Sequence, residues 1–253
     1  MDMLAELLAR GGSALLEGFP PDGREYWAAR FWDRAAAEQH VQLRSEFLTQ
    51  KETIAELLRK YGQDAKQVIE VACGTGEFTA MAAKLTPASE ITAIDISAEG
   101  LARTAKRVKH DNLKLVEGDF WADHDLGQAD LVQCLDAIHH LGDLRQVLVR
   151  LRSLMKPGGV FVGNLWIGDN FHEFQRKRYG TAAHLVRTAS FFGTAVIIRA
   201  SAGQLKTGAY RTQLTKSEDA VAVLRDVFDE VVEVRKERYF MGFVCRMNDG
   251  PQQ

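Results

Sequence analysis

A glycine-rich turn after an apolar segment is the part of this sequence whose residue types and spacing best define a chemistry. Residues 68–71 are mostly apolar and β-branched, as in a buried strand, and are soon followed by Gly74-Thr75-Gly76 and a helix-like stretch over 78–85. Glycines let a ligand approach the backbone closely, and a helix start offers unpaired N–H groups. A second apolar run over 91–94 ends in Asp95, whose carboxylate is placed to accept hydrogen bonds from ribose hydroxyls. The pattern predicts a site for a small molecule that contains a nucleoside.

Two other nucleotide-binding loops do not fit this turn. The dinucleotide fingerprint Gly-x-Gly-x-x-Gly needs a third glycine at the position where this chain has Thr79. A Walker-type phosphate loop ends in Gly-Lys-Ser or Gly-Lys-Thr, and the sequence contains neither triplet. The turn therefore favours a nucleoside ligand other than a dinucleotide or a nucleoside triphosphate.

The turn instead resembles the first motif of the class I S-adenosylmethionine-dependent methyltransferases, through Glu70-x-x-Cys73-Gly74-Thr75-Gly76. In that family the acid near the strand end lies close to the methionine ammonium group of the cofactor, and the glycine turn passes under the ligand. Ala72 stands where the family usually has glycine, so we expect its methyl group to shift the backbone slightly. The resemblance implies cofactor binding by Glu70, Ala72, Cys73, Gly74 and Gly76.

Four later segments resemble further motifs of the same family, in the same order. Asp95-Ile96-Ser97 resembles the second motif, whose acid binds the ribose, and residues 115–120 resemble the third, whose acid contacts the adenine amine. Residues 129–141 resemble the fourth strand and its loop, and residues 154–162 resemble the turn into the fifth strand. Over about residues 65–166, the resemblance adds a second set of cofactor-binding residues: Asp95, Ile96, Gly118, Asp119, Phe120 and Asp136.

Apolar periodicity predicts helices that alternate with strands. Helical spacing recurs over residues 44–60, 98–108 and 143–155, and residues 230–246 have the pattern of two strands. Strands that alternate with helices imply a parallel sheet covered on both faces. The resemblance implies an α/β fold: a Rossmann-like, doubly wound, mostly parallel seven-stranded sheet with a C-terminal antiparallel hairpin. An N-terminal helical lid is expected in addition, from the aromatic residues of that segment.

We expect the chain to contain two regions. Residues 1–62 would form the N-terminal helical segment or lid, and residues 63–253 the S-adenosylmethionine-binding methyltransferase domain. A substrate-side insertion is expected at about 167–211, because a connection of that length usually carries function or extra helices.

Charge and cysteine content restrict the partners. The 253-residue chain has a formal net charge of −2, so it has no overall positive field to hold a polyanion, and we expect no nucleic-acid partner. Its three cysteines show no metal-ligand spacing and suit reduced thiols, which predicts a cytoplasmic protein without a metal site. No apolar stretch is judged long enough to span a bilayer, and the N-terminus lacks a basic leader, so no membrane partner is expected.

The acceptor is expected near the loop after the fourth strand, because ligands of open α/β sheets bind at the carboxyl ends of the strands. Asp136, His139 and His140 fall in this loop. Either histidine could take a proton from the acceptor, contact cofactor or acceptor without proton transfer, or only shape the loop. His139 is favoured as the catalytic base, since it stands three residues from Asp136 and could pair with it in a helical turn.

Aromatic side chains near two segments could bind the acceptor. Tyr26, Trp27 and Phe31 could belong to a lid that stacks on the acceptor, or could simply anchor the N-terminal helix. Trp166 and Phe171 could line a pocket near the insertion. The apolar run over 191–198 could be pocket wall, buried core or the face of a homodimer.

The resemblance and these features together predict methyl transfer from S-adenosylmethionine to a small organic acceptor, a secondary-metabolite or aromatic or amine intermediate. O-methylation is placed ahead of N- and C-methylation because a histidine base is available. The alternatives are an RNA or protein methyltransferase, and a protein that binds S-adenosylmethionine without transferring its methyl group.

Overall fold

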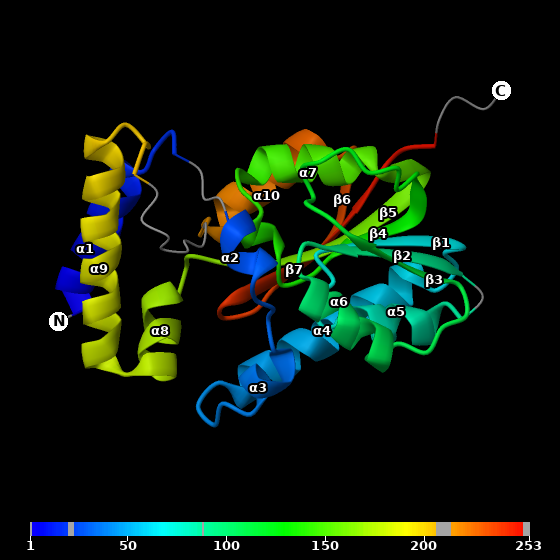
Figure 1. Ribbon diagram of the computed structural model, residues 1–253, viewed down its shortest axis with the longest axis horizontal. Helices are drawn as coiled ribbons and strands as arrows, with labels where there is room; N and C mark the ends of the chain where they lie inside the picture. Colours follow the sequence, from blue (N-terminus) through cyan, green and yellow to red (C-terminus); the bar gives the residue numbers. More distant parts are fainter. Residues whose placement is uncertain (1, 20–22, 88, 206–213, 250–253) are drawn as a thin grey trace.

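Seven strands form one sheet in the computed structural model, which describes residues 2–19, 23–87, 89–205 and 214–249. The strand order is β3-β2-β1-β4-β5-β7-β6 (Figure 1). Strands β1 to β5 pair in parallel, whereas β7 is antiparallel to both β5 and β6. The predicted mixed sheet and its C-terminal hairpin are therefore confirmed. The strands are β1 (Gln67–Val71), β2 (Glu90–Asp95), β3 (Leu113–Glu117), β4 (Ala129–Cys134), β5 (Met155–Trp166), β6 (Glu230–Lys236) and β7 (Phe240–Arg246).

Helices cover both faces of this sheet, as a parallel sheet requires. One face packs against three helices, α4 (Arg44–Gly62), α5 (Glu77–Leu85) and α6 (Ala98–Arg107), and the other against α7 (Leu144–Ser153) and α10 (Ser217–Val227) (Figure 1). The apolar stripes predicted over 44–60 and 143–155 include most of the buried faces of α4 and α7. Helix α6 instead buries Gly100, Leu101 and Thr104, and two alanines of the stripe predicted there, Ala102 and Ala105, are exposed. Central strands such as β1 bury side chains on both faces, which explains their continuous apolar sequence.

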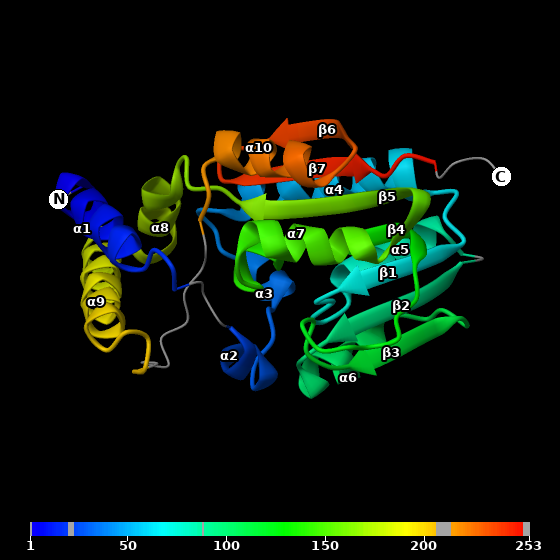
Figure 2. The ribbon, with the colours of Figure 1, turned by 90° about the horizontal axis from the view of Figure 1, so that it is seen from above.

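Three helices lie beyond the carboxyl end of the sheet, away from its main layers (Figures 1 and 2). They are α1 (Asp2–Leu15), α8 (Phe171–Tyr179) and α9 (Thr181–Ala200), and α1 runs along α9. A Cβ atom at Gly12 would approach the ring of Phe191 to 2.5 Å, so glycine permits the close contact of α1 with α9. Part of the apolar run over 191–198 therefore packs between these two helices. Of the predicted insertion, residues 206–211 lie outside the described part of the chain.

Helix α9 is, among the described residues, the one helix that is long and apolar enough to cross a membrane by length and composition. His184 and Arg187 lie within its otherwise mostly apolar sequence. In the structure 22% of its apolar window is buried. Length and composition alone do not establish a membrane span.

The N-terminal segment divides between two locations. Helix α1 packs on α9, whereas α2 (Arg24–Ala28) and α3 (Arg34–Glu38) lie near the carboxyl ends of the strands. The loop between α2 and α3 contributes residues 30–32 to the wall of the main cavity. We refer to residues 23–38 as the lid segment.

Candidate active site

A cavity that is partly open to solvent lies at the carboxyl ends of β1, β2 and β4 beneath the lid segment. Its wall includes most of the residues that the sequence assigned to cofactor and acceptor. Those that line it are Trp27, Phe31, Ala72, Cys73, Gly74, Asp95, Ile96, Gly118, Asp119, Phe120, Asp136 and His140. Six predicted site residues are not part of the wall: Tyr26, Glu70, Gly76, His139, Trp166 and Phe171.

The glycine turn has the backbone conformation that its sequence predicts. Gly74 has a φ of +55°, and no heavy atom lies within 4 Å of the position a Cβ would occupy there. Gly76 has a φ of +75° and precedes α5, and a Cβ on it would come within 2.7 Å of Thr104. Gly74 therefore leaves open space at the wall of the cavity, while Gly76 permits tight packing behind it.

Ala72 also has a positive φ, of 57°. This left-handed region favours glycine, because in other residues Cβ crowds the backbone. The alanine therefore adopts the left-handed conformation and bears its energetic cost.

Ala72→Gly is expected to raise the free energy of unfolding by about 0.5–1 kcal/mol, because the relief of strain exceeds the entropy that glycine adds to the unfolded chain. Urea unfolding followed by circular dichroism measures this. The control is Ala102→Gly, the same change on the exposed side of α6, which should destabilise by about 1 kcal/mol. Equal losses in both variants would contradict the strain at Ala72.

Asp95 lies at the end of β2 and shapes the turn as well as the cavity. Its Oδ2 accepts a hydrogen bond from the backbone N–H of Gly74 at 2.7 Å, and its Oδ1 accepts one from that of Ser97 at 2.8 Å. Burial raises the pKa of its carboxyl group, which these backbone donors partly offset. Each carboxylate oxygen keeps a further lone pair for a ligand hydroxyl.

Asp119, after β3, is in contact with the lid segment. Its Oδ2 lies 3.4 Å from Nη1 of Arg24 on α2, and its Oδ1 accepts a hydrogen bond from the backbone N–H of Trp121 at 3.0 Å. The residue that the resemblance assigns to the adenine amine therefore also ties the lid segment to the body of the domain.

Glu70 on β1 is buried behind the turn rather than in the wall of the cavity. Its Oε2 has no hydrogen-bond partner in the described structure, and the same is true of Oγ1 of Thr79 and of both side-chain polar atoms of Gln133. Burial raises the pKa of the Glu70 carboxyl group to about 8. Its proposed contact with the cofactor would need this buried group to be reached from the cavity.

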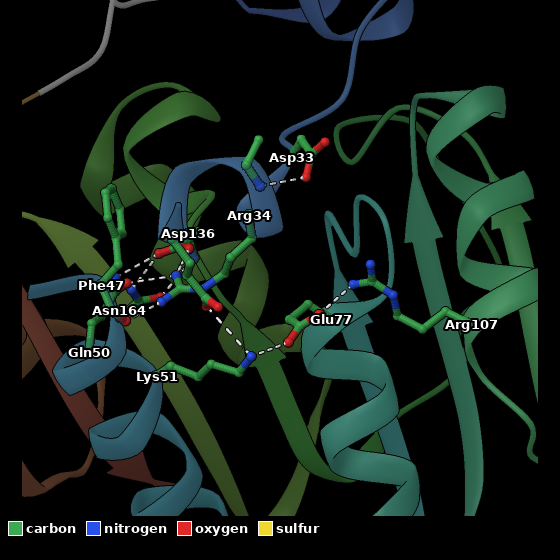
Figure 3. Close-up of polar contacts among 11 residues, drawn as sticks. Asp33, Arg34, Phe47, Gln50, Lys51, Glu77, Arg107, Asp136 and Asn164 are labelled. Atoms are coloured by element: carbon green, nitrogen blue, oxygen red, sulfur yellow. Dashed lines mark hydrogen bonds and ion pairs between the residues drawn. The ribbon is translucent and has the colours of Figure 1, made fainter. Parts of the chain in front are cut away.

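Asp136 follows β4 and is the centre of a buried polar network (Figure 3). Its carboxylate forms an ion pair with Arg34 of α3 and accepts hydrogen bonds from Nε2 of Gln50 at 2.7 Å and Nδ2 of Asn164 at 2.9 Å. Its backbone N–H donates to Oδ1 of Asn164 at 2.7 Å. Asp136 has a φ of 56°, so this network holds a non-glycine residue in a strained conformation.

Arg34 was not predicted as a site residue from the sequence. In the structure its side chain is buried, with 2% of its surface exposed. Besides Asp136, it donates to Oε1 of Gln50 at 2.6 Å, to the carbonyl oxygen of Phe47 at 2.7 Å and to Glu38 at 3.0 Å. The spacing of Arg34 and Glu38 within one helix is the only part of this set that a sequence pattern indicates.

The network continues to the cofactor side of the cavity through alternating charges (Figure 3). Nζ of Lys51 lies 3.5 Å from Glu38 and also pairs with Glu77 at the start of α5. Glu77 in turn pairs with Arg107 at 2.5 Å. These ion pairs join the lid segment to the helix that follows the glycine turn.

The two histidines have different surroundings. His140 lines the cavity, and its ring centroid lies 5.2 Å from that of Trp27. His139 is buried behind it and stacks on Trp166, whose backbone N–H lies 3.4 Å from Nδ1 of His139. The Nε2 atom of His139 has no hydrogen-bond partner in the described part of the chain. Burial lowers the pKa of His139 to about 4 and that of His140 well below its ordinary value.

The predicted hydrogen-bonded pair of His139 with Asp136 is not found among the described contacts. The Asp136 carboxylate is already engaged by Arg34, Gln50 and Asn164, and the imidazole turns instead to Trp166. The preference for His139 over His140 rested on that pair and therefore loses its support.

The predicted aromatic site residues divide into those that line the cavity and those that do not. Trp27 and Phe31 line the cavity, together with Trp32, while the ring of Tyr26 stacks against Arg30. Trp166 belongs to a buried cluster with Phe174 and Phe240, because β5 carries it under α8. Phe171 begins α8 and its ring lies beside His172. Tyr26, Trp166 and Phe171 thus do not line this cavity, and their contact with an acceptor stays a prediction.

The residues fit a nucleoside-containing cofactor. An open glycine position, a carboxylate at the end of β2 and another after β3 all meet the same cavity. A doubly wound parallel sheet with this site defines a Rossmann-like ligand-binding domain.

Comparison with known proteins agrees with this class. Residues 69–161 match the family described as "Methyltransferase domain". The chain is 36% identical over 95 residues to the trans-aconitate 2-methyltransferase of Deinococcus radiodurans. This alignment covers 37% of this chain and 35% of that protein. It is 33% identical over 109 residues to the ubiquinone biosynthesis O-methyltransferase of Erwinia tasmaniensis, over 41% of this chain and 44% of that protein. Residues 69–161 are thus similar to a methyltransferase domain, which agrees with the resemblance to the class I S-adenosylmethionine-dependent methyltransferases.

Among solved structures, the N-methyltransferase NodS of Bradyrhizobium japonicum aligns with a TM-score of 0.53 at 17% identity, over 79% of this chain and 97% of that chain. At this identity the likeness shows the fold. The matched regions span from 24% to 54% of the length of the first curated relatives.

Proposed function

We propose that this protein transfers a methyl group from S-adenosylmethionine to a small organic acceptor, with O-methylation ahead of N- and C-methylation. The main support for the proposal is that two sets of residues line the same cavity. The glycine turn, Asp95 and Asp119 form its cofactor side, and the lid aromatics Trp27 and Phe31 cover it. The names of two relatives, a trans-aconitate and a ubiquinone biosynthesis methyltransferase, support a small acceptor.

The residues of this chain would mainly bind, orient and exclude water. The bound cofactor supplies an electrophilic methyl group, and transfer needs the acceptor atom to be aligned with that group at near-contact distance. The lid segment covers part of the cavity on the acceptor side, which reduces the access of water. We assign contact with the acceptor to His140, which lines the cavity, and support of its ring to His139.

We also propose a cytoplasmic location and no nucleic-acid partner. The three cysteines are free and buried, as suits a reducing compartment, and the net charge is −2. A homodimer remains a prediction. The alternative of a protein that binds S-adenosylmethionine without methyl transfer is distinguished by acceptor assays.

Calorimetric titration with S-adenosylmethionine, S-adenosylhomocysteine and NAD tests the cofactor. We expect micromolar affinity for the two adenosyl compounds and no binding of NAD. Asp95→Ala should weaken S-adenosylhomocysteine binding about 10- to 100-fold, because charge-assisted hydrogen bonds are lost. Asp226→Ala, on the exposed side of α10, is the matched control. Full affinity in Asp95→Ala would contradict the role of that residue, and failure of both adenosyl compounds to bind would contradict the proposed function.

A further inference from the structure

Arg30 differs from the other charged residues of the cavity wall. It lies in the lid segment between α2 and α3, and its side chain is exposed. Its guanidinium stacks on the ring of Tyr26 at 4.3 Å and donates to the carbonyl oxygen of the same residue at 3.3 Å. No carboxylate among the described residues pairs with it. Arg30 is thus a cationic residue of the cavity wall that no acid among the described residues neutralises.

The other charges of the wall are already engaged. Arg24 pairs with Asp119, and Arg34 with Asp136. Glu77 pairs with both Lys51 and Arg107. Asp95 accepts two backbone hydrogen bonds and is assigned to the ribose. An anionic group that enters the cavity could therefore form an ion pair with Arg30, which no described carboxylate already engages.

The wall also lacks a strong proton acceptor in its described part. Three donors engage the Asp136 carboxylate, and Asp119 contacts Arg24 and the N–H of Trp121. Burial lowers the pKa of His140 well below its ordinary value, which makes its imidazole a weak base. A phenol or another weak acid would have to lose its proton in this environment, whereas a carboxylate enters already ionised at neutral pH.

We propose that the acceptor of this enzyme is a carboxylate, which Arg30 holds in the cavity and which is methylated on oxygen to an ester. The inference rests on the proposed methyltransferase function and narrows its substrate class. The arginine fork can take a carboxylate in bidentate fashion, and Trp27 and Phe31 would pack on the apolar part of the acceptor.

The step balances without a base. One carboxylate oxygen supplies the electron pair of the new O–C bond to the methyl carbon, and the C–S bond breaks with its pair remaining on sulfur. The negative carboxylate and the positive sulfonium become a neutral ester and a neutral thioether. No proton moves, which agrees with the surroundings of His140 and Asp136.

The test uses matched acceptors and the full chain. Cinnamate, indole-3-acetate and octanoate are compared with their primary amides, and with catechol and tyramine, for transfer of labelled methyl from S-adenosylmethionine. We expect esters from at least one carboxylate and at least tenfold less product from its amide. Arg30→Gln should raise KM for that carboxylate about tenfold, and Arg30→Lys should restore part of the loss. Arg145→Gln, on the exposed side of α7, is the matched control.

The carboxylate bound by Arg30 could also be that of the cofactor itself, and a second titration separates the two sources. S-adenosylhomocysteine carries this carboxylate and 5′-methylthioadenosine does not. If Arg30→Gln weakens binding of the first but not of the second, Arg30 serves the cofactor and our substrate assignment is overturned. Transfer to catechol or tyramine in preference to every carboxylate also overturns it, as does failure of all three carboxylates as acceptors. Normal binding of S-adenosylhomocysteine in these cases would leave the proposed cofactor intact.

Discussion

Replacing Arg34 with methionine should lower the free energy of unfolding by about 3–5 kcal/mol, because it leaves Asp136 as a buried charge without its cationic partner. The side chain of Asp136 is 6% exposed, so water cannot take the place of the guanidinium. Methionine is of similar length and keeps most of the apolar packing of the arginine stem. Urea unfolding monitored by circular dichroism measures the change.

A double-mutant cycle shows whether this loss arises from the pair. Asp136→Asn keeps the shape of the side chain and tolerates the positive φ, but leaves Arg34 with Glu38 as its one acidic partner among the described residues. We expect the double variant to be less destabilised than the sum of the single variants, by more than about 1 kcal/mol. Arg145→Met, in an exposed pair with Asp226, is the control and should change stability by less than about 1 kcal/mol. A similarly small effect of Arg34→Met would show that the buried pair does not hold the lid segment.

Glu70→Gln is expected to make the protein more stable at neutral pH, by an amount that grows as pH rises. Burial raises the pKa of Glu70 to about 8 in the folded chain, above its ordinary value of 4.5. The folded state therefore holds a proton that the unfolded state releases. The stability of the fold is greatest below the unfolded-state pKa of 4.5 and is lost as pH rises toward the folded-state pKa of about 8. From about pH 5 to pH 7.5, the gain of the variant over the natural chain should grow by about 3 kcal/mol.

Parallel denaturation series across this pH range measure the difference between the two chains. Glu90→Gln, at the exposed start of β2, controls for the loss of one carboxylate from the sheet. A constant difference between Glu70→Gln and the natural chain would contradict a proton held at Glu70. It would indicate instead that rearrangement of Thr79 or Gln133 provides the partner that Oε2 lacks here.

Local patterns were sufficient for the frame of the molecule. β-branched runs, apolar stripes and the glycines at 74 and 76 predicted the strands, the helices α4, α6 and α7 and the turn, since each depends on residues a few positions apart. The order of motifs predicted that Asp95 and Asp119 would meet, because parallel strands end at the same edge of a sheet. The sequence by itself thus determined the fold class and placed Asp95 and Asp119 at one edge of the sheet, while their contact with the cofactor stays a prediction.

The acceptor side was decided by tertiary structure. Arg34 and Asp136 are 102 positions apart, and their pairing depends on how α3 packs over the loop after β4, which no local period encodes. The same packing engages Asp136, so His139 turns away to Trp166 and His140 is left at the cavity. Aromatic residues have the same pattern whether they serve as wall or as core, and only the depth of each backbone segment separates Trp27 from Trp166. Charge pairing and burial are properties of the assembled layers, and they determine which of the predicted residues can meet an acceptor.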